Sequence, residues 1–137
     1  MSFQARDVTG RSDLRYVSCP VAREVVHHKS ILFGRQERWG RTGILVEGVF
    51  DVFRLGPLAC ATFGTAVKSE QVVEVARHFD RVCIVFDPEP AATARARRLA
   101  TTLRIRLGVE PVVVDIGGGD PGSMAQDDAD ALMRSLI

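Results

Sequence analysis

Acidic residues follow three of the short apolar segments in this sequence of 137 residues. The five acids of this set are Glu47, Asp51, Asp87, Glu89 and Asp120. Carboxylates that a fold brings together repel one another, and burial adds to the cost of keeping them charged. A divalent cation relieves both effects, and oxygen ligands without neighbouring histidine or cysteine favour Mg²⁺ or Mn²⁺ over zinc. The acids therefore predict a Mg²⁺ or Mn²⁺ site, with the alternative that each one is a helix cap or a solvated loop residue.

Small residues accompany these acids. Gly48 removes a side chain next to Glu47 and lets the backbone turn into a following helix. Gly64 and Thr65 follow another apolar segment, and they offer backbone N–H groups and a hydroxyl that suit phosphate oxygens. The spacing therefore predicts a phosphate-binding turn in addition to the metal site.

Short apolar runs alternate with segments of helical period from residue 43 onward. The expected strands are 43–47, 59–63, 82–86 and 111–115, and the expected helices are 49–55, 69–79, 91–107 and 126–136. Near-continuous apolar runs are typical of strands covered on both faces. Their alternation with helices predicts an α/β fold with a mainly parallel sheet. Right-handed crossovers place the carboxyl ends of such strands at one edge, where ligands bind, and the acids lie at these ends.

The first thirty residues differ from the rest. They are polar and lack a clear period, so we expect an extended or partly ordered arm over residues 1–30 and one domain over residues 31–137. The net charge of +1 does not separate classes of partner. No apolar run reaches the length of a membrane span, and the N-terminus lacks the apolar core of a signal peptide. These features predict a cytoplasmic protein with no membrane partner.

Two motifs resemble those of the Toprim family. The segment 44–51, Ile-Leu-Val-Glu-Gly-Val-Phe-Asp, is similar to the first Toprim motif, a strand ending in Glu-Gly with an Asp three residues after the glycine. The segment 85–89, Val-Phe-Asp-Pro-Glu, is similar to the second, a strand ending in Asp-x-Asp. Segments that resemble the bacterial-type DNA primases of this family are 16–20, 28–34, 61–66 and 119–121. The resemblance implies a Toprim (Rossmann-like) fold of about four mainly parallel strands with helices on both faces, after an extended N-terminal arm that is a remnant of the primase linker segment.

The resemblance also implies roles for individual residues. The implied catalytic residues are Glu47, Asp87 and Glu89, with Glu47 as general acid or base. The implied ligands of Mg²⁺ or Mn²⁺ are Glu47, Asp51, Asp87, Glu89 and Asp120, and the implied nucleotide- and phosphate-binding residues are Lys29, Gly48, Gly64 and Thr65. The implied reaction is DNA-directed RNA polymerisation, in which a 3′-hydroxyl attacks an α-phosphate and an RNA primer for DNA replication is made. Its partners would be a single-stranded DNA template, nucleoside triphosphates and a subunit that supplies zinc-binding, template-binding or helicase functions.

Three positions depart from the primase pattern. Glu89 stands in place of an Asp, residues 90–92 lack the usual basic residue, and Gly122 replaces an acid for which Asp127 or Asp128 is a candidate substitute. The zinc-binding, full N-terminal polymerase and helicase-binding regions of a complete primase are missing from this sequence. This minimal pattern predicts a phage-encoded or split primase component.

The sequence leaves three functions open. They are a primase catalytic module, a metal-dependent nuclease of the Toprim type, and a non-catalytic module that binds DNA or another replication protein. The arginines of the segment 91–107 are interpreted as a solvated helix face rather than a nucleic-acid contact. His27 and His28 lack a third metal ligand in the sequence pattern. Phe33 and Trp39 are interpreted as residues that pack the arm on the sheet rather than stack on a base.

Overall fold

The computed structural model describes residues 3–13, 16–64 and 66–137. Its strands are β1 (Gln4–Arg6), β2 (Tyr16–Ser18), β3 (Phe33–Gly34), β4 (Thr42–Val46), β5 (Ala59–Ala61), β6 (Arg81–Ile84) and β7 (Glu110–Val113). Its α-helices are α1 (Val49–Leu55), α2 (Ser69–His78), α3 (Pro90–Leu107) and α4 (Gln126–Leu136). Short 3-10 helices are η1 (Val21–Arg23), η2 (His28–Ser30), η3 (Gln36–Arg38) and η4 (Pro121–Ser123).

A five-stranded sheet forms the centre of the molecule, in the order β3-β5-β4-β6-β7. Strands β4 to β7 run parallel, and β3 pairs antiparallel with β5 at one edge. The central strand is β4, in which Leu45 lies beside Cys60 of β5 on one side and Ile84 of β6 on the other. Because the four strands are parallel, the segments that follow them meet at one edge of the sheet.

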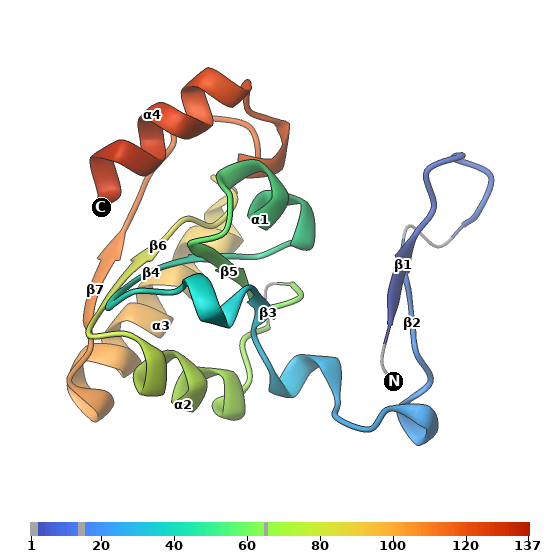
Figure 1. Ribbon diagram of the computed structural model, residues 1–137, viewed down its shortest axis with the longest axis horizontal. Coiled ribbons are helices and arrows are strands. Elements are labelled where there is room, and N and C mark those ends of the chain that lie inside the picture. Colours follow the sequence, from blue (N-terminus) through green and yellow to red (C-terminus); the bar gives the residue numbers. More distant parts are fainter. Residues whose placement is uncertain (1–2, 14–15, 65) are drawn as a thin grey trace.

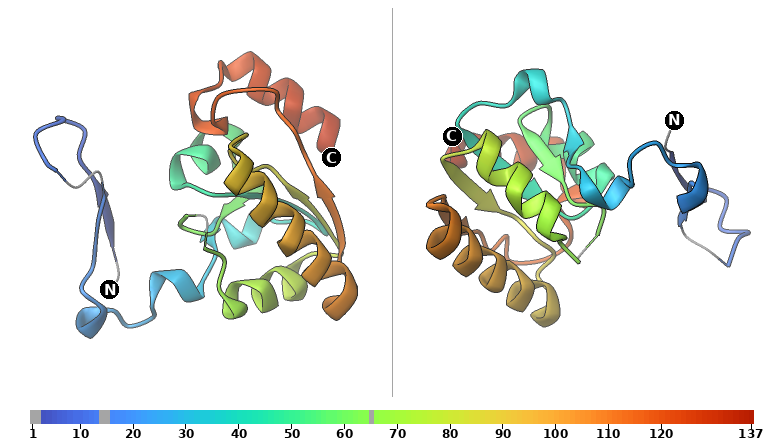
Figure 2. Two further views of the ribbon diagram at one scale, coloured as in Figure 1. Left: turned by 180° about the vertical axis from the view of Figure 1, so that it is seen from behind. Right: turned by 90° about the horizontal axis from the view of Figure 1, so that it is seen from below.

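Helices cover both faces of this sheet (Figures 1 and 2). Leu45 and Ile84 belong to the core under α2 and α3, whereas Ile44 and Cys83 belong to the core under α1 and α4. Successive residues of a strand point to opposite faces, so β4 and β6 contribute to both cores. Ile44 and Leu45 are each 0% exposed, as expected for a strand that is covered on both sides.

The predicted α/β fold with a mainly parallel sheet is confirmed. The four predicted strands and four predicted helices are all present, with ends that differ by at most two residues. The edge strand β3 is an addition, because two residues are too few to show a period. Trp39 packs against the core under α2 and α3, and Phe33 packs against the core under α1 and α4, in agreement with the packing interpretation. Among the described residues, no helix has both the length and the apolar character that crossing a membrane requires.

The N-terminal segment contains two short strands. Strands β1 and β2 form an antiparallel hairpin that stands beside the domain, and among the described strands it is a sheet of its own (Figure 1). Each strand has three residues, which is too short for alternation to be recognised in a sequence. The chain then passes through η1 and η2 before it enters the sheet at β3.

Gln71 of α2 fastens the end of this arm to the domain. Its side chain is fully buried, and its amide Nε2 donates to the carbonyls of Ile31 (2.9 Å) and Thr62 (2.8 Å). Its Oε1 accepts the N–H of Lys68 at 3.0 Å. The side chain therefore joins the arm, the segment after β5 and the start of α2.

Replacing Gln71 by leucine is expected to lower the free energy of unfolding by about 1–3 kcal/mol, because buried backbone groups lose their hydrogen-bond partners. Chemical denaturation of the two proteins measures this difference. An unchanged midpoint and slope would mean that water satisfies these groups equally well, and that Gln71 does not fasten the arm.

Candidate active site

Glu47 and Asp51 enter the site from β4 and α1. Glu47 follows the last residue of β4 and is 7% exposed, and Asp51 lies in the first turn of α1 and is 6% exposed. The N–H of Gly48, the residue that caps α1, donates to Asp51 Oδ2 at 2.8 Å. A carboxylate in the first turn accepts otherwise unpaired N–H groups and interacts favourably with the helix dipole. The strand end and the helix start thus fix both acids. Gly48 has a backbone conformation that any residue can adopt (φ −114°). A glycine therefore matters here because it places no side chain beside Glu47 and Asp51.

The pKa of Glu47 is raised to about 7, first by burial and then by the charge of Asp87. The backbone N–H of Asp87 donates to Glu47 Oε1 at 3.3 Å, which opposes this rise. A carboxyl group that titrates near neutral pH suits general acid–base chemistry, and it also gains from a bound cation.

Asp87 and Asp120 bring two further acids to the same edge. Asp87 follows the β6 segment, is half-buried, and has a raised pKa because of burial, the charge of Asp120 and the charge of Glu89. Asp120 is exposed and precedes η4. Glu89 caps the start of α3 and is exposed. Together with Glu47, these acids come from the three segments that follow β4, β6 and β7, as the parallel sheet predicts.

A cavity of about 440 Å³ lies over this edge of the sheet. The acids that line it are Glu47, Asp51, Asp87 and Asp120. The other lining residues are Arg6, Ser18, His28, Lys29, Gly48, Val49, Phe50, Phe63 and Gly64. Glu89 is not part of this lining, although its charge acts on Asp87. The cavity therefore has an acidic floor on the domain and a wall with cationic side chains from the arm.

The turn after β5 differs in one respect from the phosphate-binding turn that the sequence predicts. The Gly64 N–H donates to the carbonyl of Glu47 at 2.8 Å, so it is engaged within the protein. Gly64 has φ +113° and Phe63 has φ +59°, a conformation in which a bulky side chain is strained. The turn fixes the backbone of Glu47 and places the Phe63 ring against His28 (5.6 Å between centroids). Thr65, the other residue of the predicted turn, lies outside the described residues.

Gly122 fills a place where the primase pattern has an acid. Its N–H donates to Asp51 Oδ1 at 3.0 Å, so both oxygens of Asp51 accept backbone N–H groups. A Cβ atom at this position would lie 2.9 Å from Asp51 Oδ1. The loop therefore approaches Asp51 as closely as a glycine allows. Asp127 and Asp128 are exposed in the first turn of α4 and do not line the cavity, so neither takes the place of the missing acid there.

Restoring an acid by Gly122→Asp is expected to destabilise the protein by about 1–3 kcal/mol, because the new side chain must displace Asp51 or the loop. The matched control is Gly118→Asp, since a Cβ there meets nothing within 4 Å. Thermal unfolding should separate the two variants. Equal stability would mean that the loop moves freely away from Asp51.

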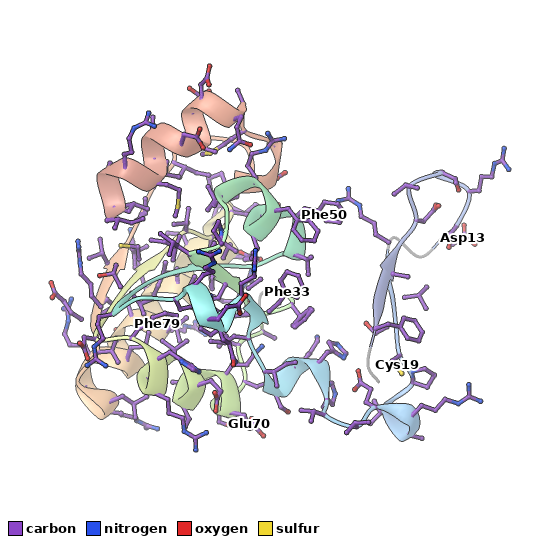
Figure 3. All side chains as sticks on the ribbon, viewed as in Figure 1. Asp13, Cys19, Phe33, Phe50, Glu70 and Phe79 are labelled. Atoms are coloured by element: carbon purple, nitrogen blue, oxygen red, sulfur yellow. The ribbon has the colours of Figure 1, made fainter. Side chains whose placement is uncertain are left out.

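Arg6, His28, Phe50 and Phe63 line the cavity without having been singled out as site residues in the sequence. Arg6 lies over the Phe50 ring, with 4.5 Å from its guanidinium carbon to the ring centroid. Phe50 is 40% exposed and, like Phe33, lies on the side of the domain that faces the hairpin (Figure 3). Arg6 is recognised as a cavity residue from the position of the hairpin. His28 could have been found in the sequence, because it directly precedes the predicted phosphate-binding residue Lys29.

The residue types at this edge suit a hard divalent cation. Among the described residues, only Glu24, His27 and His28 bring three ligand atoms within 4.8 Å of one another, so the acids of the sheet edge would have to move closer together to share one ion. Asp87, Asp120 and Glu47 offer carboxylate oxygens to the cavity, and burial, followed by the charges of neighbouring acids, raises the pKa of Glu47 and Asp87. Asp51 completes the negative field, although its oxygens already accept two N–H groups. Oxygen ligands of this type are those that Mg²⁺ and Mn²⁺ prefer.

Comparison with known proteins identifies the fold. No family model matches the chain, and no curated protein matches it. Among solved structures, it is similar to the zinc-binding and RNA polymerase domains of the Aquifex aeolicus primase, with 26% identity and a TM-score of 0.79 over 98% of this chain. A DNA primase domain from Pseudomonas aeruginosa has 26% identity and a TM-score of 0.77 over 99% of this chain. The DnaG primase catalytic domain bound to single-stranded DNA has 21% identity and a TM-score of 0.78, also over 99%.

The chain spans less than half of each of these structures, namely 36%, 46% and 47% of their lengths. The similarity covers both the domain and the N-terminal segment, because nearly the whole chain is aligned. The chain has the Toprim fold, in the form found in the catalytic cores of DnaG-type primases.

Proposed function

We propose that this chain is the Toprim catalytic module of a primase-type nucleotidyltransferase, which makes RNA primers on single-stranded DNA. The observation that carries the proposal is the cavity, which the acids of the sheet edge and Lys29 of the arm line together. A nucleoside triphosphate bound with Mg²⁺ or Mn²⁺ needs both acidic and cationic side chains, because acids hold the cation and cationic groups hold the phosphates. The similarity to primase catalytic cores supports the same assignment.

The residues of the chain would divide the work as follows. Asp87, Asp120 and Glu47 would hold the divalent cation, which when bound supplies charge neutralisation and a more acidic attacking hydroxyl. Glu47, with its pKa of about 7, would take up the proton of the 3′-hydroxyl. Lys29 would orient the triphosphate from the opposite wall. Asp51 would act as a positioning residue, since it holds the backbone at Gly48 and the loop before α4.

Exposed aromatic side chains near the cavity suit a single-stranded nucleic acid. Phe50 and Phe53 are 40% and 66% exposed and neighbour each other on α1, a surface on which bases can stack. A structural neighbour is bound to single-stranded DNA, which supports a DNA template as ligand. A partner subunit would supply template-binding, zinc-binding or helicase functions, as the resemblance to primases implies.

The test is extension of a short RNA primer on a single-stranded DNA template with Mn²⁺ and labelled nucleoside triphosphates. We expect addition of nucleotides that match the template and loss of this addition in Glu47→Gln. A minimal primed template lowers the demand on the partner, because primer initiation is bypassed.

Two other outcomes would replace the proposal. Cleavage of the nucleic acid to short fragments, abolished by Asp87→Asn, would identify the chain as a Toprim-type nuclease. Neither addition nor cleavage, with Mn²⁺ and DNA still bound, would identify it as a non-catalytic DNA-binding or replisome-binding module.

A further inference from the structure

We propose that Glu24, His27 and His28 form a second metal site, which binds a borderline divalent cation such as Zn²⁺. The three residues lie in the segment that joins the hairpin to the domain, outside the acidic set of the sheet edge. Each offers one ligand atom, and the three atoms lie within 4.8 Å of one another. The sequence pattern shows only the two neighbouring histidines, and the fold adds the carboxylate.

The distances between these atoms agree with zinc coordination. Nδ1 of His28 lies 2.7 Å from Oε1 of Glu24, and Nδ1 of His27 lies 3.5 Å from Oε2 of the same carboxylate. A tetrahedral zinc with bonds of about 2.0–2.1 Å separates its nitrogen and oxygen ligand atoms by about 3.3 Å. The two observed distances lie on either side of that value. They involve different oxygens of Glu24, so the side chains must shift to share one ion.

A cation at this cluster would replace hydrogen bonds that the two histidines now make. Nδ1 of His27 accepts the backbone N–H of Lys29 at 3.1 Å, so this nitrogen presents a lone pair. The same nitrogen lies 3.5 Å from Oε2 of Glu24. Nδ1 of His28 donates to Glu24 at 2.7 Å, and metal binding at this nitrogen would release that proton. The backbone N–H of Lys29 would then donate to a water molecule instead of to His27, since this contact is exposed to solvent.

The three side chains differ in burial. The side chains of Glu24 and His28 are 1% and 11% exposed, whereas that of His27 is 42% exposed. A cation would enter past His27 and find two ligands already held in place. Three protein ligands leave one position for water or an anion, as in zinc sites with two histidines and one glutamate.

A cation here would stabilise the segment that carries His28 and Lys29 to the active-site cavity. The ring of His28 also contacts Phe63, so the segment is already in contact with the domain at this point. The two metal sites differ in ligand type, since the sheet edge offers carboxylates alone and this cluster offers imidazole nitrogens. Zn²⁺ and Co²⁺ should therefore prefer the cluster, and Mg²⁺ should prefer the sheet edge.

The test uses the full chain carrying Asp87→Asn, which weakens the acidic site, titrated with Zn²⁺ and with Co²⁺. We expect one equivalent of Zn²⁺ to bind and Co²⁺ to give the visible absorption of a tetrahedral site. His27→Asn and Glu24→Gln should each weaken binding about 100-fold or more. His78→Asn is the matched control, because His78 is a partly exposed histidine 3.5 Å from Glu74, and no third ligand joins this pair among the residues that the structure describes.

The outcomes separate a metal site from an ion pair. Binding that is lost in His27→Asn and kept in His78→Asn supports the site. Absence of stoichiometric Zn²⁺ binding, or equal binding by all variants, would overturn it and leave a histidine–glutamate ion pair. Because Glu24 is buried, unfolding without metal is measured for each variant, and His27→Asn, at the exposed ligand, decides the result if Glu24→Gln fails to fold. Primer extension is not part of this readout, so the active-site proposal stands or falls separately.

Discussion

Asp87→Asn is expected to weaken Mn²⁺ binding by about 100-fold and to abolish metal-dependent nucleotide addition, since a cation at the sheet edge loses a charged ligand. Asp87 lines the cavity, and burial together with the charges of Asp120 and Glu89 raises its pKa. An asparagine keeps the shape and removes the charge. The signal of free Mn²⁺ in electron paramagnetic resonance measures the change directly.

The matched control for this prediction is Asp128→Asn. Asp128 is exposed in the first turn of α4 and does not line the cavity, so its replacement should leave Mn²⁺ affinity unchanged. Equal loss in both variants would point to diffuse electrostatic attraction rather than coordination. Unchanged affinity in Asp87→Asn would remove Asp87 from the set of ligands.

Glu47→Gln is expected to abolish nucleotide addition while it stabilises the metal-free protein at pH 8. The pKa of Glu47 is about 7 in the folded protein and 4.5 in the reference state, so the folded state holds a proton that the unfolded chain releases. Stability of the wild type therefore falls as the pH rises from about 4.5 to about 7, and it is flat for this group above that range. The neutral glutamine avoids this loss, which corresponds to about 1–3 kcal/mol at pH 8.

Denaturation in a metal chelator at several pH values tests this second prediction. The difference between Glu47→Gln and the wild type should grow between pH 5 and pH 7.5 and then level off, by about 1–3 kcal/mol in total. Glu110→Gln, at an exposed position of β7, serves as the control and should show no such growth. Saturating Mn²⁺ should stabilise the wild type by about 2.7 kcal/mol at a hundred times its dissociation constant, and the variant much less. A difference that does not depend on pH would contradict the raised pKa of Glu47.

The parallel sheet and its acidic edge could be predicted because strong periodic patterns specify them. The runs around Leu45 and Ile84 are apolar without interruption, and this pattern indicates strands that helices cover on both faces. Handedness then places Glu47, Asp87 and Asp120 at one edge without any knowledge of contacts. The cavity has all three acids in its lining.

The rest depends on contacts between distant segments, which a single sequence does not show. The hairpin strands have three residues each, and only their placement brings Arg6 over Phe50. The Gly64 N–H is suited to phosphate until the fold shows that the Glu47 carbonyl accepts it. Similarly, Gly122 looks like a lost ligand until its closeness to Asp51 is seen. In each case the outcome depends on which groups from distant segments contact or hydrogen-bond each other, and tertiary packing determines these contacts.

The most direct test of the account is a crystal structure of the chain grown with Mn²⁺, with anomalous data collected at the manganese absorption edge. We predict a peak at the sheet edge, within coordination distance of carboxylate oxygens of Asp87 and Asp120 and close to Glu47. A cavity without an anomalous peak at saturating Mn²⁺, or manganese held only by residues outside that edge, would contradict the central claim that these acids form a metal site.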